Sequence, residues 1–283
     1  MVEAFTPGSL REALDIRDKK DVVVFAGGTD LMVRYKRGPS VPLDFQKSVL
    51  FIGHLEELKR IALEEGFLVI GAAATLTEVL EHSRIPEVMK SALGVMASPA
   101  VRNSGTLGGN ICNASPAGDT LPPLYALGAT LVLKSKADSR EIPVESFIKG
   151  PGKIDLHSDE ILTSVKIPVK EYPVLFYKKV GTRKADALSK LSFAGLAEID
   201  NGVVKEWRAA FGAVAPTVVR NKDIEKRMIG ENVAKVQQRI PELIDLYSSH
   251  IKPIDDQRST ASYRKTTSLR LLEHFIKEYC NKP

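Results

Sequence analysis

Two segments of the sequence combine glycines with small hydroxyl and amide residues, a combination that suits the binding of phosphate groups. The first is FAGGTDL, residues 25–31, in which an apolar strand pattern leads into two adjacent glycines and then into a helix pattern. Glycine permits positive φ angles and a close approach of the backbone to a ligand. Thr29 offers a hydroxyl donor, and a helix beginning near Asp30 would point its positive end at an anion. A pyrophosphate could therefore meet a bare backbone here, although an ordinary strand-to-helix turn has the same composition.

The second segment is SGTLGGNICNASPAGDT, residues 104–120, which is rich in glycine and contains five Ser, Thr or Asn side chains before Asp119. Its polar groups need partners if they are buried, whereas the flanking Val101 and residues 121–127 are apolar. The segment is therefore either a flexible surface loop or the wall of a ligand site. A carboxylate such as Asp119 is unsuited to a place beside phosphates but suits a ribose or ribityl hydroxyl.

The standard alternatives for phosphate binding and hydrolysis are missing from the sequence. It contains no G-x-x-x-x-G-K-[ST], no G-x-G-x-x-G, no H-E-x-x-H and no G-x-S-x-G. The five histidines are scattered without the spacing of metal ligands, so no metal site is expected. Cys112 lies inside the second segment, where it is either a reactive thiol or a small buried apolar residue.

Composition places the chain among ordinary globular proteins. Its 283 residues correspond to nearly two domains at about 150 residues each, and its net charge of +5 gives no strong indication of nucleic-acid binding. Cys112 and Cys280 are the only cysteines, so the chain alone builds neither a disulfide framework nor a Cys-based zinc or iron–sulfur site, and a reducing cytoplasm is expected. A signal-peptide pattern and an apolar run of about 20 residues are both missing, which predicts a protein that is neither secreted nor membrane-spanning.

Local patterns predict an N-terminal half of mixed helices and strands. Ser9 and Glu12 have the spacing of a capping box that begins a helix over residues 10–19, and Thr75 and Glu78 repeat that spacing. Other predicted elements are strands over residues 21–26, 130–134 and 161–167, a hairpin over residues 61–70, a helix begun by Pro86 and ended by Ser98-Pro99, and an irregular stretch from Asn103 to Pro123.

The second half has the pattern of an antiparallel sheet followed by helices. Residues 174–180 and 191–199 read as strands, and Asn201-Gly202 indicates a type I′ hairpin into a strand over residues 203–214. Helical patterns begin at Asp223 and end with a helix over residues 268–279. The fold class predicted from these patterns is α+β.

These residues resemble a known family, the FAD-binding (medium) subunits of molybdenum hydroxylases such as xanthine dehydrogenase and carbon monoxide dehydrogenase. The resemblance rests on AGGTDL at residues 26–31, GTLGGNICNASPAGDTLPPLYALGATL at residues 105–131 and EILTSVKIP at residues 160–168, with FYKKVGTRKADALSKLSFAGLAEI at residues 176–199. It implies a two-subdomain FAD-binding domain of the molybdopterin dehydrogenase type over residues 1–170, with subdomains of about 1–55 and 56–170. It also implies a C-terminal flavoprotein domain, an antiparallel sheet with helices, over residues 171–283.

The resemblance implies a set of FAD-binding residues. Those matched to the diphosphate and nearby groups are Ala26, Gly27, Gly28, Thr29, Asp30 and Leu31, and those matched to a second wall are Thr106, Gly109, Asn110, Asn113, Ser115 and Asp119, with Asp119 binding cofactor hydroxyls. Val101 and Leu162 match apolar positions against the adenine or isoalloxazine. Lys179 matches a catalytic lysine beside the flavin, where its charge would favour the reduced flavin, although its neighbour Lys178 leaves the register ambiguous by one residue. Arg183 and Lys184 match basic residues near the exposed face of the flavin.

The resemblance also implies partners. Two cysteines cannot hold the two [2Fe–2S] clusters that connect a molybdenum site to a flavin, so these belong on a small iron–sulfur subunit, beside a large molybdopterin subunit. This chain would pass electrons from those clusters through FAD to NAD⁺ or another acceptor. Two alternatives are a stand-alone FAD-dependent oxidoreductase and a basic adaptor that only binds polyanions. The substrate of the complex and its final electron acceptor are not encoded in these patterns.

Overall fold

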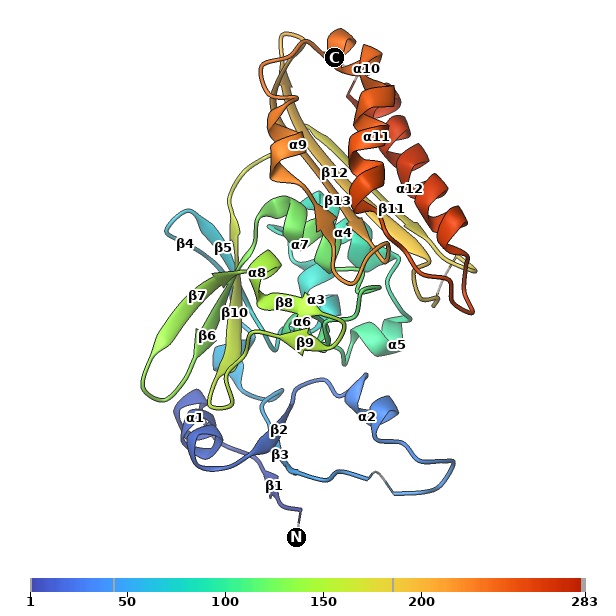
Figure 1. Cartoon of the computed structure of the whole chain (residues 1–283). Helices are drawn as coiled ribbons and strands as arrows, with labels where there is room; N and C mark the ends of the chain where they lie inside the picture. Colours follow the sequence, from blue (N-terminus) through green and yellow to red (C-terminus); the bar gives the residue numbers. More distant parts are fainter. Residues whose placement is uncertain (1, 43, 185, 281–283) are drawn as a thin grey trace. The chain divides into compact units, whose positions relative to one another are not determined.

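The computed structural model describes residues 2–42, 44–184 and 186–280, which form two compact units (Figure 1). Unit 1 consists of Met1–Arg84, Ser98–Ala114 and Ala129–Val169, and unit 2 of Ile85–Ala97, Ser115–Gly128 and Lys170–Pro283. Both units mix helices and strands, which confirms the α+β class. The two units are defined by contacts between residues and consist of discontinuous segments. They therefore do not test the division into domains 1–170 and 171–283, with subdomains of about 1–55 and 56–170, which stays a prediction.

The first sheet of unit 1 has three parallel strands in the order β1-β3-β2. Its strands are β1 (Ala4–Phe5), β2 (Val22–Phe25) and β3 (Ser48–Phe51). Helix α1, Leu10–Lys19, connects β1 with β2 as the sequence predicts, and the Ser9 hydroxyl accepts a hydrogen bond from the Glu12 N–H at its start. Apolar side chains of α1, β2 and β3 pack with Leu58 and Ile161 into a small core, so this sheet is attached to the rest of unit 1 by buried contacts.

The second sheet of unit 1 is antiparallel, with the order β4-β5-β10-β6-β7. Its strands are β4 (Ile61–Glu64), β5 (Phe67–Gly71), β6 (Thr130–Lys134), β7 (Ser139–Pro143) and β10 (Ile161–Pro168). Strands β4 and β5 form the predicted hairpin, with Glu65 and Gly66 at φ 48° and 81° in its turn. The remaining elements near this sheet are the 3-10 turn η1 (Glu56–Leu58), helix α8 (Val144–Phe147) and the two-stranded pair β8 (Ile148–Gly150) and β9 (Lys153–Ile154).

Helix α3, Leu76–Glu81, follows strand β5 and begins at the predicted capping box. The Thr75 hydroxyl accepts a hydrogen bond from the Glu78 N–H, and the Glu78 carboxylate accepts one from the Thr75 N–H. Both backbone donors at the start of α3 therefore have partners. The short helix α2, Leu31–Arg34, comes earlier in the chain and begins at the last residue of the first glycine segment.

The prediction of an irregular stretch from Asn103 to Pro123 was wrong. Helix α6, Leu107–Asn113, begins inside it with Thr106 as N-cap. Its two glycines are each about 1 kcal/mol less favourable than alanine in a helix, so the apolar periodicity of the sequence does not indicate a helix there. The role assigned to Ser98-Pro99 was also wrong, because Ser98 caps the start of a new helix, α5, Pro99–Arg102.

Unit 2 is built on a four-stranded antiparallel sheet in the order β11-β12-β13-β14. Its strands are β11 (Val174–Val180), β12 (Leu191–Asp200), β13 (Val203–Gly212) and β14 (Val219–Arg220). Asn201 and Gly202 connect β12 to β13 with φ angles of 50° and 75°, the positive pair that a type I′ turn requires. The predicted strands of the second half and their hairpin are therefore confirmed.

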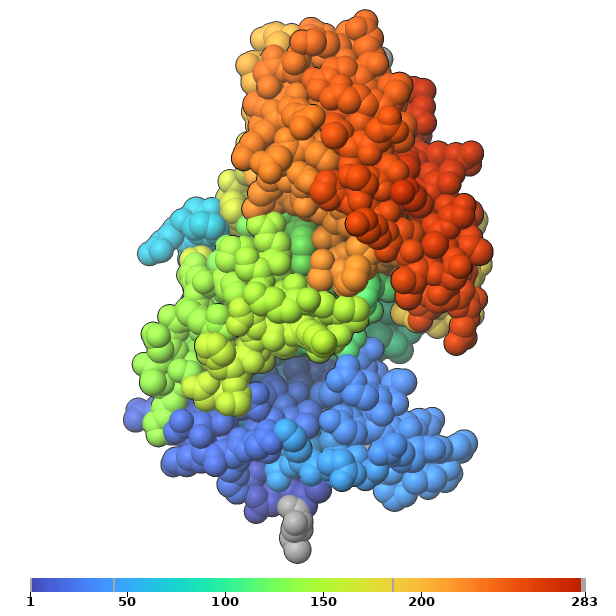
Figure 2. Space-filling model, viewed as in Figure 1, coloured from blue at the N-terminus to red at the C-terminus, as the bar shows by residue number. Residues whose placement is uncertain are grey.

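Helices cover both faces of this sheet. They are α4 (Glu87–Gly94) and α7 (Leu121–Leu127) on one face, and α9 (Lys222–Lys226), α10 (Val233–Gln238), α11 (Ile240–His250) and α12 (Ala261–His274), with the final π-helical turn η2 (Phe275–Tyr279), on the other. The last helix begins at Ala261 under a Thr260 cap, seven residues earlier than the predicted 268–279. Figure 2 shows the C-terminal helices, orange to red, as a continuous outer surface of unit 2.

The two faces of the unit 2 sheet bury different kinds of side chain. The face towards α10, α11 and α12 is aromatic, with Phe193 and Trp207 packed on Phe275 at ring-centroid distances of 5.7 and 4.9 Å. The opposite face contacts α7, whose seven residues are all buried. A Cβ at Gly212 would lie 2.7 Å from the Pro122 ring, so strand and helix are in direct contact there. None of the helices within the described ranges combines the length and the apolar character needed to cross a membrane.

Candidate functional site

The structure brings the two glycine segments together inside unit 1. A Cβ built on Gly27 would lie 1.9 Å from the carbonyl oxygen of Ser104 and 2.9 Å from the Cα of Gly105. Since real Cβ atoms do not approach backbone so closely, only glycine fits at residue 27. Gly28 adopts φ +72°, and a Cβ there would also meet the Phe25 ring. Both glycines of the first segment are therefore required by the protein itself.

Backbone donors of the first segment are without protein partners. The four N–H groups of residues 27–30 donate no hydrogen bond to any residue in the part of the chain that the structure describes. Gly27, Gly28 and Thr29 are nevertheless half-buried. Half-buried backbone donors need an acceptor, and successive free N–H groups in a glycine turn are a recurrent means of binding phosphate oxygens. This donor set fits the diphosphate of FAD.

Helix α2 contributes less to this site than the sequence suggests. It has a single turn, and the exposed Asp30 at its start makes no side-chain cap. The macrodipole of one turn is small, so the free N–H groups, and not a helix end, are the feature that suits an anion. Thr29 lies close by, with its hydroxyl oxygen 3.3 Å from a Cβ built on Gly105.

The N–H groups at the start of helix α6, in the second segment, already have acceptors within the protein. The N–H groups of Leu107 and Gly108 donate to the carbonyls of Ala74 and Ala72 at 3.0 and 2.8 Å, and a Cβ at Gly108 would lie 2.7 Å from the Ala72 side chain. Gly108 is thus a packing glycine that lets α6 lie directly on the strand end. The Gly109 N–H donates to the hydroxyl of Thr106, the N-cap, at 3.1 Å.

Gly109 differs from Gly108 because it faces open space. It is exposed, and a Cβ there would meet only the Thr106 hydroxyl, at 2.9 Å, within the chain described. At the other end of α6, the Asn113 side-chain oxygen accepts a hydrogen bond from Arg34 of α2 at 2.8 Å. Arg34 therefore ties the two segments together at a second point, and no pattern in the sequence indicates it.

The predicted site residues divide between the units. Those in unit 1 are Ala26, Gly27, Gly28, Thr29, Asp30, Leu31, Val101, Thr106, Gly109, Asn110, Asn113 and Leu162, and those in unit 2 are Ser115, Asp119 and Lys179. Val101 presents an apolar side chain that is 37% exposed, whereas Leu162 lies in β10 and is buried. Asn110 is half-buried in α6, and the Ser115 hydroxyl accepts a hydrogen bond from the Ala117 N–H.

Asp119 is the centre of a buried polar cluster in unit 2. Its Oδ2 accepts a hydrogen bond from the Lys179 ammonium at 2.7 Å, and its Oδ1 accepts one from the Ser189 hydroxyl at 2.5 Å. The Lys179 ammonium also donates to the carbonyl of Val95 at 3.2 Å. The side chains of Asp119 and Lys179 are 7% and 8% exposed, so the ion pair is nearly sealed from water.

Strand register decides which lysine of β11 joins the cluster. Side chains alternate between the faces of a strand, and Tyr177 and Lys179 share the face that meets Asp119 and Val95. Lys178 points to the other face and is exposed. The alternation alone could have indicated Tyr177 from the sequence, but Ser189 lies in an irregular loop and gives no such signal.

Burial and the ammonium oppose each other at Asp119. Burial raises the pKa of Asp119 above its usual value, while Lys179, Ser189 and Tyr177 act to lower it. Burial also raises the pKa of the Tyr177 hydroxyl well above its ordinary value, and the neighbouring Asp119 adds to that rise. The tyrosine is therefore a neutral hydroxyl group, and the charged residues of the cluster are the carboxylate and the lysine.

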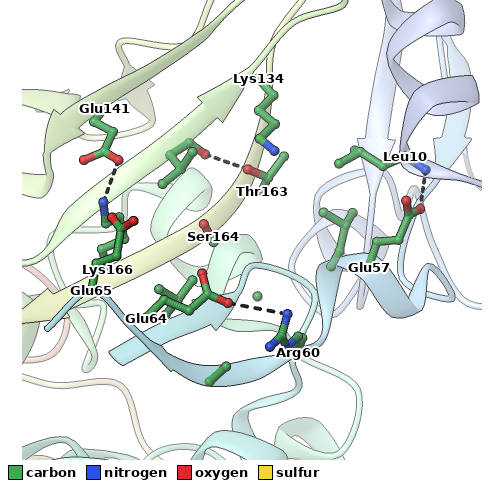
Figure 3. A pocket seen from close by; sticks show the side chains of 15 residues that line it. Leu10, Glu57, Arg60, Glu64, Glu65, Lys134, Glu141, Thr163, Ser164 and Lys166 are labelled. Carbon is green, nitrogen blue, oxygen red and sulfur yellow. Dashed lines mark hydrogen bonds and ion pairs between the residues drawn. The ribbon is translucent and has the colours of Figure 1, made fainter. Parts of the chain in front are cut away.

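A cavity of about 560 Å³ on unit 1 is a separate feature (Figure 3). It lies against the antiparallel sheet, between charged side chains that are largely paired with one another: Lys166 with Glu141 at 2.7 Å, and Arg60 with Glu64 at 3.5 Å. None of the predicted site residues lines it. Because none of the residues matched to FAD lines it, we do not assign the cofactor to this cavity.

The cysteines lack the surroundings of metal ligands. Burial raises the pKa of both the Cys112 and the Cys280 thiol to about 12, which keeps them protonated and unreactive at neutral pH. Among the described residues there is no group of three or more His, Cys, Asp or Glu side chains that could hold a metal ion.

Comparison with known proteins identifies the two parts of the chain. A family model described as the FAD binding domain in molybdopterin dehydrogenase matches residues 1–170, and one described as the CO dehydrogenase flavoprotein C-terminal domain matches residues 176–279. The xanthine dehydrogenase FAD-binding subunit of Escherichia coli O157:H7 is 31% identical over 264 residues, which cover 90% of this chain and 88% of that protein. The glyceraldehyde dehydrogenase medium chain of Sulfolobus acidocaldarius is 31% identical over 91% of this chain and 90% of its own length.

A solved structure agrees with these matches. Reconstituted CO dehydrogenase from Oligotropha carboxidovorans contains a chain that superposes with a TM-score of 0.90 over 100% of this chain and 99% of its own, at 21% identity, which shows a shared fold. The resemblance read from the glycine segments is thereby confirmed. The chain belongs to the FAD-binding (medium) subunits of the molybdenum hydroxylase family, a family of oxidoreductases.

Proposed function

We propose that this chain is the flavin-bearing electron-transfer subunit of a xanthine-dehydrogenase-like molybdenum hydroxylase. In this role it accepts electrons from [2Fe–2S] clusters on a partner subunit and passes them through FAD to NAD⁺ or another acceptor. The observation that carries the proposal is the set of free N–H groups at residues 27–30 beside Ser104–Gly105. Successive half-buried N–H groups without protein acceptors are suited to the oxygens of an anion.

Within unit 1, the proposed role of the glycine segments is to hold the diphosphate. The N–H groups of residues 27–30 donate to its oxygens, with the Thr29 hydroxyl beside them. The exposed Gly109 leaves room for the ligand because, among the described residues, a Cβ there would meet only the Thr106 hydroxyl. Val101 supplies an exposed apolar surface for one of the rings. The remaining predicted residues keep the roles that the family resemblance implies for them.

Within unit 2, the proposed role of Lys179 is electrostatic. Its ammonium is fixed by Asp119 and by the Val95 carbonyl, so its charge is in place before the flavin is reduced. FAD, when bound, supplies the redox chemistry that joins single-electron donors to a two-electron acceptor. The ammonium end of the Asp119–Lys179 ion pair, held towards the flavin, favours the reduced, anionic flavin and raises its potential.

The small number of cysteines in this chain supports separate subunits that carry the iron–sulfur clusters. An iron–sulfur cluster needs four thiolate ligands, whereas this chain has two cysteines, both with raised pKa values. The carbon monoxide dehydrogenase medium chain of Hydrogenophaga pseudoflava is 25% identical over 97% of this chain, and its name marks it as one chain of several. We propose a small iron–sulfur subunit and a large molybdopterin subunit as partners, in the cytoplasm.

Purification tests the proposal directly. The full chain, mixed with FAD and passed through a desalting column, is expected to retain a yellow flavin spectrum, and a colourless protein would contradict the proposed function. Affinity purification from the native cell is expected to recover polypeptides that carry molybdopterin and iron–sulfur clusters. Turnover of a small substrate with NADH by the chain alone would favour the stand-alone FAD-dependent oxidoreductase instead.

A further inference from the structure

The loop between β11 and β12 places one hydroxyl group in the buried cluster of unit 2. Ser189 has no exposed surface, and its Oγ donates to Asp119 Oδ1. The Lys190 N–H donates to the Val180 carbonyl at 2.8 Å, which fixes the end of the loop against the end of β11. Ser189 is thereby held opposite the strand that carries Lys179.

The two oxygens of the Asp119 carboxylate have different partners. Oδ1 is bonded to Ser189 and Oδ2 to Lys179. A carboxylate anchored at one oxygen can still turn about its terminal torsion, which is broad and roughly two-fold. A second anchor on the other oxygen removes that freedom, so the Ser189 hydroxyl determines where Oδ2, and hence the lysine ammonium, is held.

We infer that Ser189 is a positioning residue, which acts through Asp119 to fix the Lys179 ammonium in the place from which it controls the flavin. The inference rests on the proposed function, since it assumes that Lys179 lies beside the flavin. Ser189 touches neither the cofactor nor the reacting atoms in this role. A carboxylate with only one anchor would let the ammonium spread over several positions and would weaken its preference for the reduced flavin.

The cluster offers few other groups that could do this. The Tyr177 hydroxyl donates to the backbone oxygen of Asp119 at 3.5 Å, the long limit of a hydrogen bond, and also acts on the Asp119 carboxylate to lower its pKa. Val95 binds Lys179 through a backbone carbonyl, which carries no net charge. Lys179, Ser189 and Tyr177 all act to lower the pKa of the Asp119 carboxylate, and Ser189 is the hydroxyl that lies at a short hydrogen-bond distance, 2.5 Å, from a carboxylate oxygen.

The first experiment measures the midpoint potential of bound FAD in the full chain carrying Ser189→Ala. Removal of one hydrogen bond to a charged group is expected to change the ratio of reduced to oxidised flavin affinity by about tenfold. That is about 30 mV towards negative potential for a two-electron couple. Ser189→Thr, which keeps the hydroxyl, is expected to restore most of the shift.

A matched control separates positioning from a general loss of packing. Ser268 is equally buried, and its hydroxyl donates to the Arg264 carbonyl on the far side of the sheet. Ser268→Ala is expected to lower the melting temperature about as much as Ser189→Ala but to leave the flavin potential unchanged. Equal potentials in the two alanine variants would overturn the inference.

The second experiment needs no flavin and therefore distinguishes failure of the inference from failure of the proposed function. Carboxyl-carbon NMR of the flavin-free chain follows the titration of Asp119. The Ser189 hydroxyl favours the charged carboxylate, so Ser189→Ala is expected to move this titration to higher pH. If the wild-type chain bound no FAD, the proposed function would fail; if the Asp119 titration were the same with and without Ser189, the positioning role would fail whatever the flavin did.

Discussion

The backbone at Gly27 lies directly on the carbonyl group of Ser104, so that a Cβ at residue 27 would be 1.9 Å from the Ser104 oxygen. The two glycine segments are thus in contact at this point, with no space between them for a ligand. The free N–H groups of residues 27–30 and the exposed Gly109 mark where space remains. Contact at Gly27 fixes the separation of the two segments. The free N–H groups beside it are then available to bind a ligand.

Gly27→Ala is expected to separate the segments. The added Cβ cannot be accommodated by rotation of a side chain, because the opposing atoms are backbone, and a cost of about 1–3 kcal/mol or more in unfolding free energy is typical of such overpacking. We expect a lower midpoint in urea unfolding together with loss of FAD retention on a desalting column. A variant that keeps both its stability and its flavin would show that the contact is not needed.

Gly109→Val is expected to abolish FAD retention while the chain still folds. A Cβ at residue 109 would meet only the Thr106 hydroxyl of the described protein, and the valine would occupy the space that we assign to the diphosphate. Circular dichroism would monitor the fold and flavin absorbance the binding. The matched control is Gly38→Val, whose Cβ lies 3.5 Å from Val41 in ordinary contact; if both variants retain FAD equally, the diphosphate is not beside Gly109.

Lys179→Ala is expected to lower the flavin potential more than it lowers the FAD affinity, because the lysine acts on the reduced form. It also leaves Asp119 buried without its ion-pair partner, which destabilises a protein by about 3 kcal/mol or more. Lys178→Ala, at the exposed neighbouring position, is expected to change neither property. Potentiometric titration of both variants decides the register: a shift confined to Lys178→Ala would mean that the assignment is wrong by one residue.

Glu160→Gln is expected to destabilise unit 1 in a pH-dependent way. The Arg140 guanidinium donates to both Glu160 oxygens, at 2.6 and 2.9 Å, and holds the pKa of Glu160 below its ordinary value of 4.5. A lowered pKa means that this stabilisation is complete above about pH 4.5 and is lost as the pH falls through the lowered value. We expect a loss of about 1–3 kcal/mol at neutral pH.

Urea unfolding at several pH values measures this effect. The difference between wild type and Glu160→Gln should be constant above about pH 4.5 and shrink below it. Glu56→Gln removes a comparable but exposed pair with Lys59, in which the Glu56 side chain is 84% exposed, and should cost well under 1 kcal/mol. A constant difference down to low pH would rule out the ion pair as the source of the stability.

Local signals in the sequence were sufficient for much of the fold. The capping hydroxyls of Ser9 and Thr75 begin the predicted helices, and Asn201-Gly202 makes the predicted turn, because each depends on hydrogen bonds or dihedral angles within a few residues. Helix α6 was not predictable in the same way. Its glycines oppose helix formation, and its position depends on the long-range contact between Gly108 and Ala72.

The candidate site was predictable in its residue types more than in its contacts. Glycines and small polar residues indicated phosphate chemistry, but which glycine packs on protein and which faces space follows only from the folded structure. Ser189 and Arg34 reach the predicted residues Asp119 and Asn113 through side chains. Neither has a periodic or motif signal, since both contacts join segments more than 60 residues apart in the chain.

Helices α4 and α7 precede the strands that they cover by many residues, and this limits how the protein can be divided. A fragment that begins at residue 171 would lack both helices and would expose to water the sheet surface that packs on Pro122. Such a fragment is expected to aggregate, even though a family boundary lies close to its first residue. Recombination or truncation at that boundary therefore separates the sheet of unit 2 from the helices that cover one of its faces. The C-terminal region is expected to fold as a complete unit only together with residues 85–97 and 115–128.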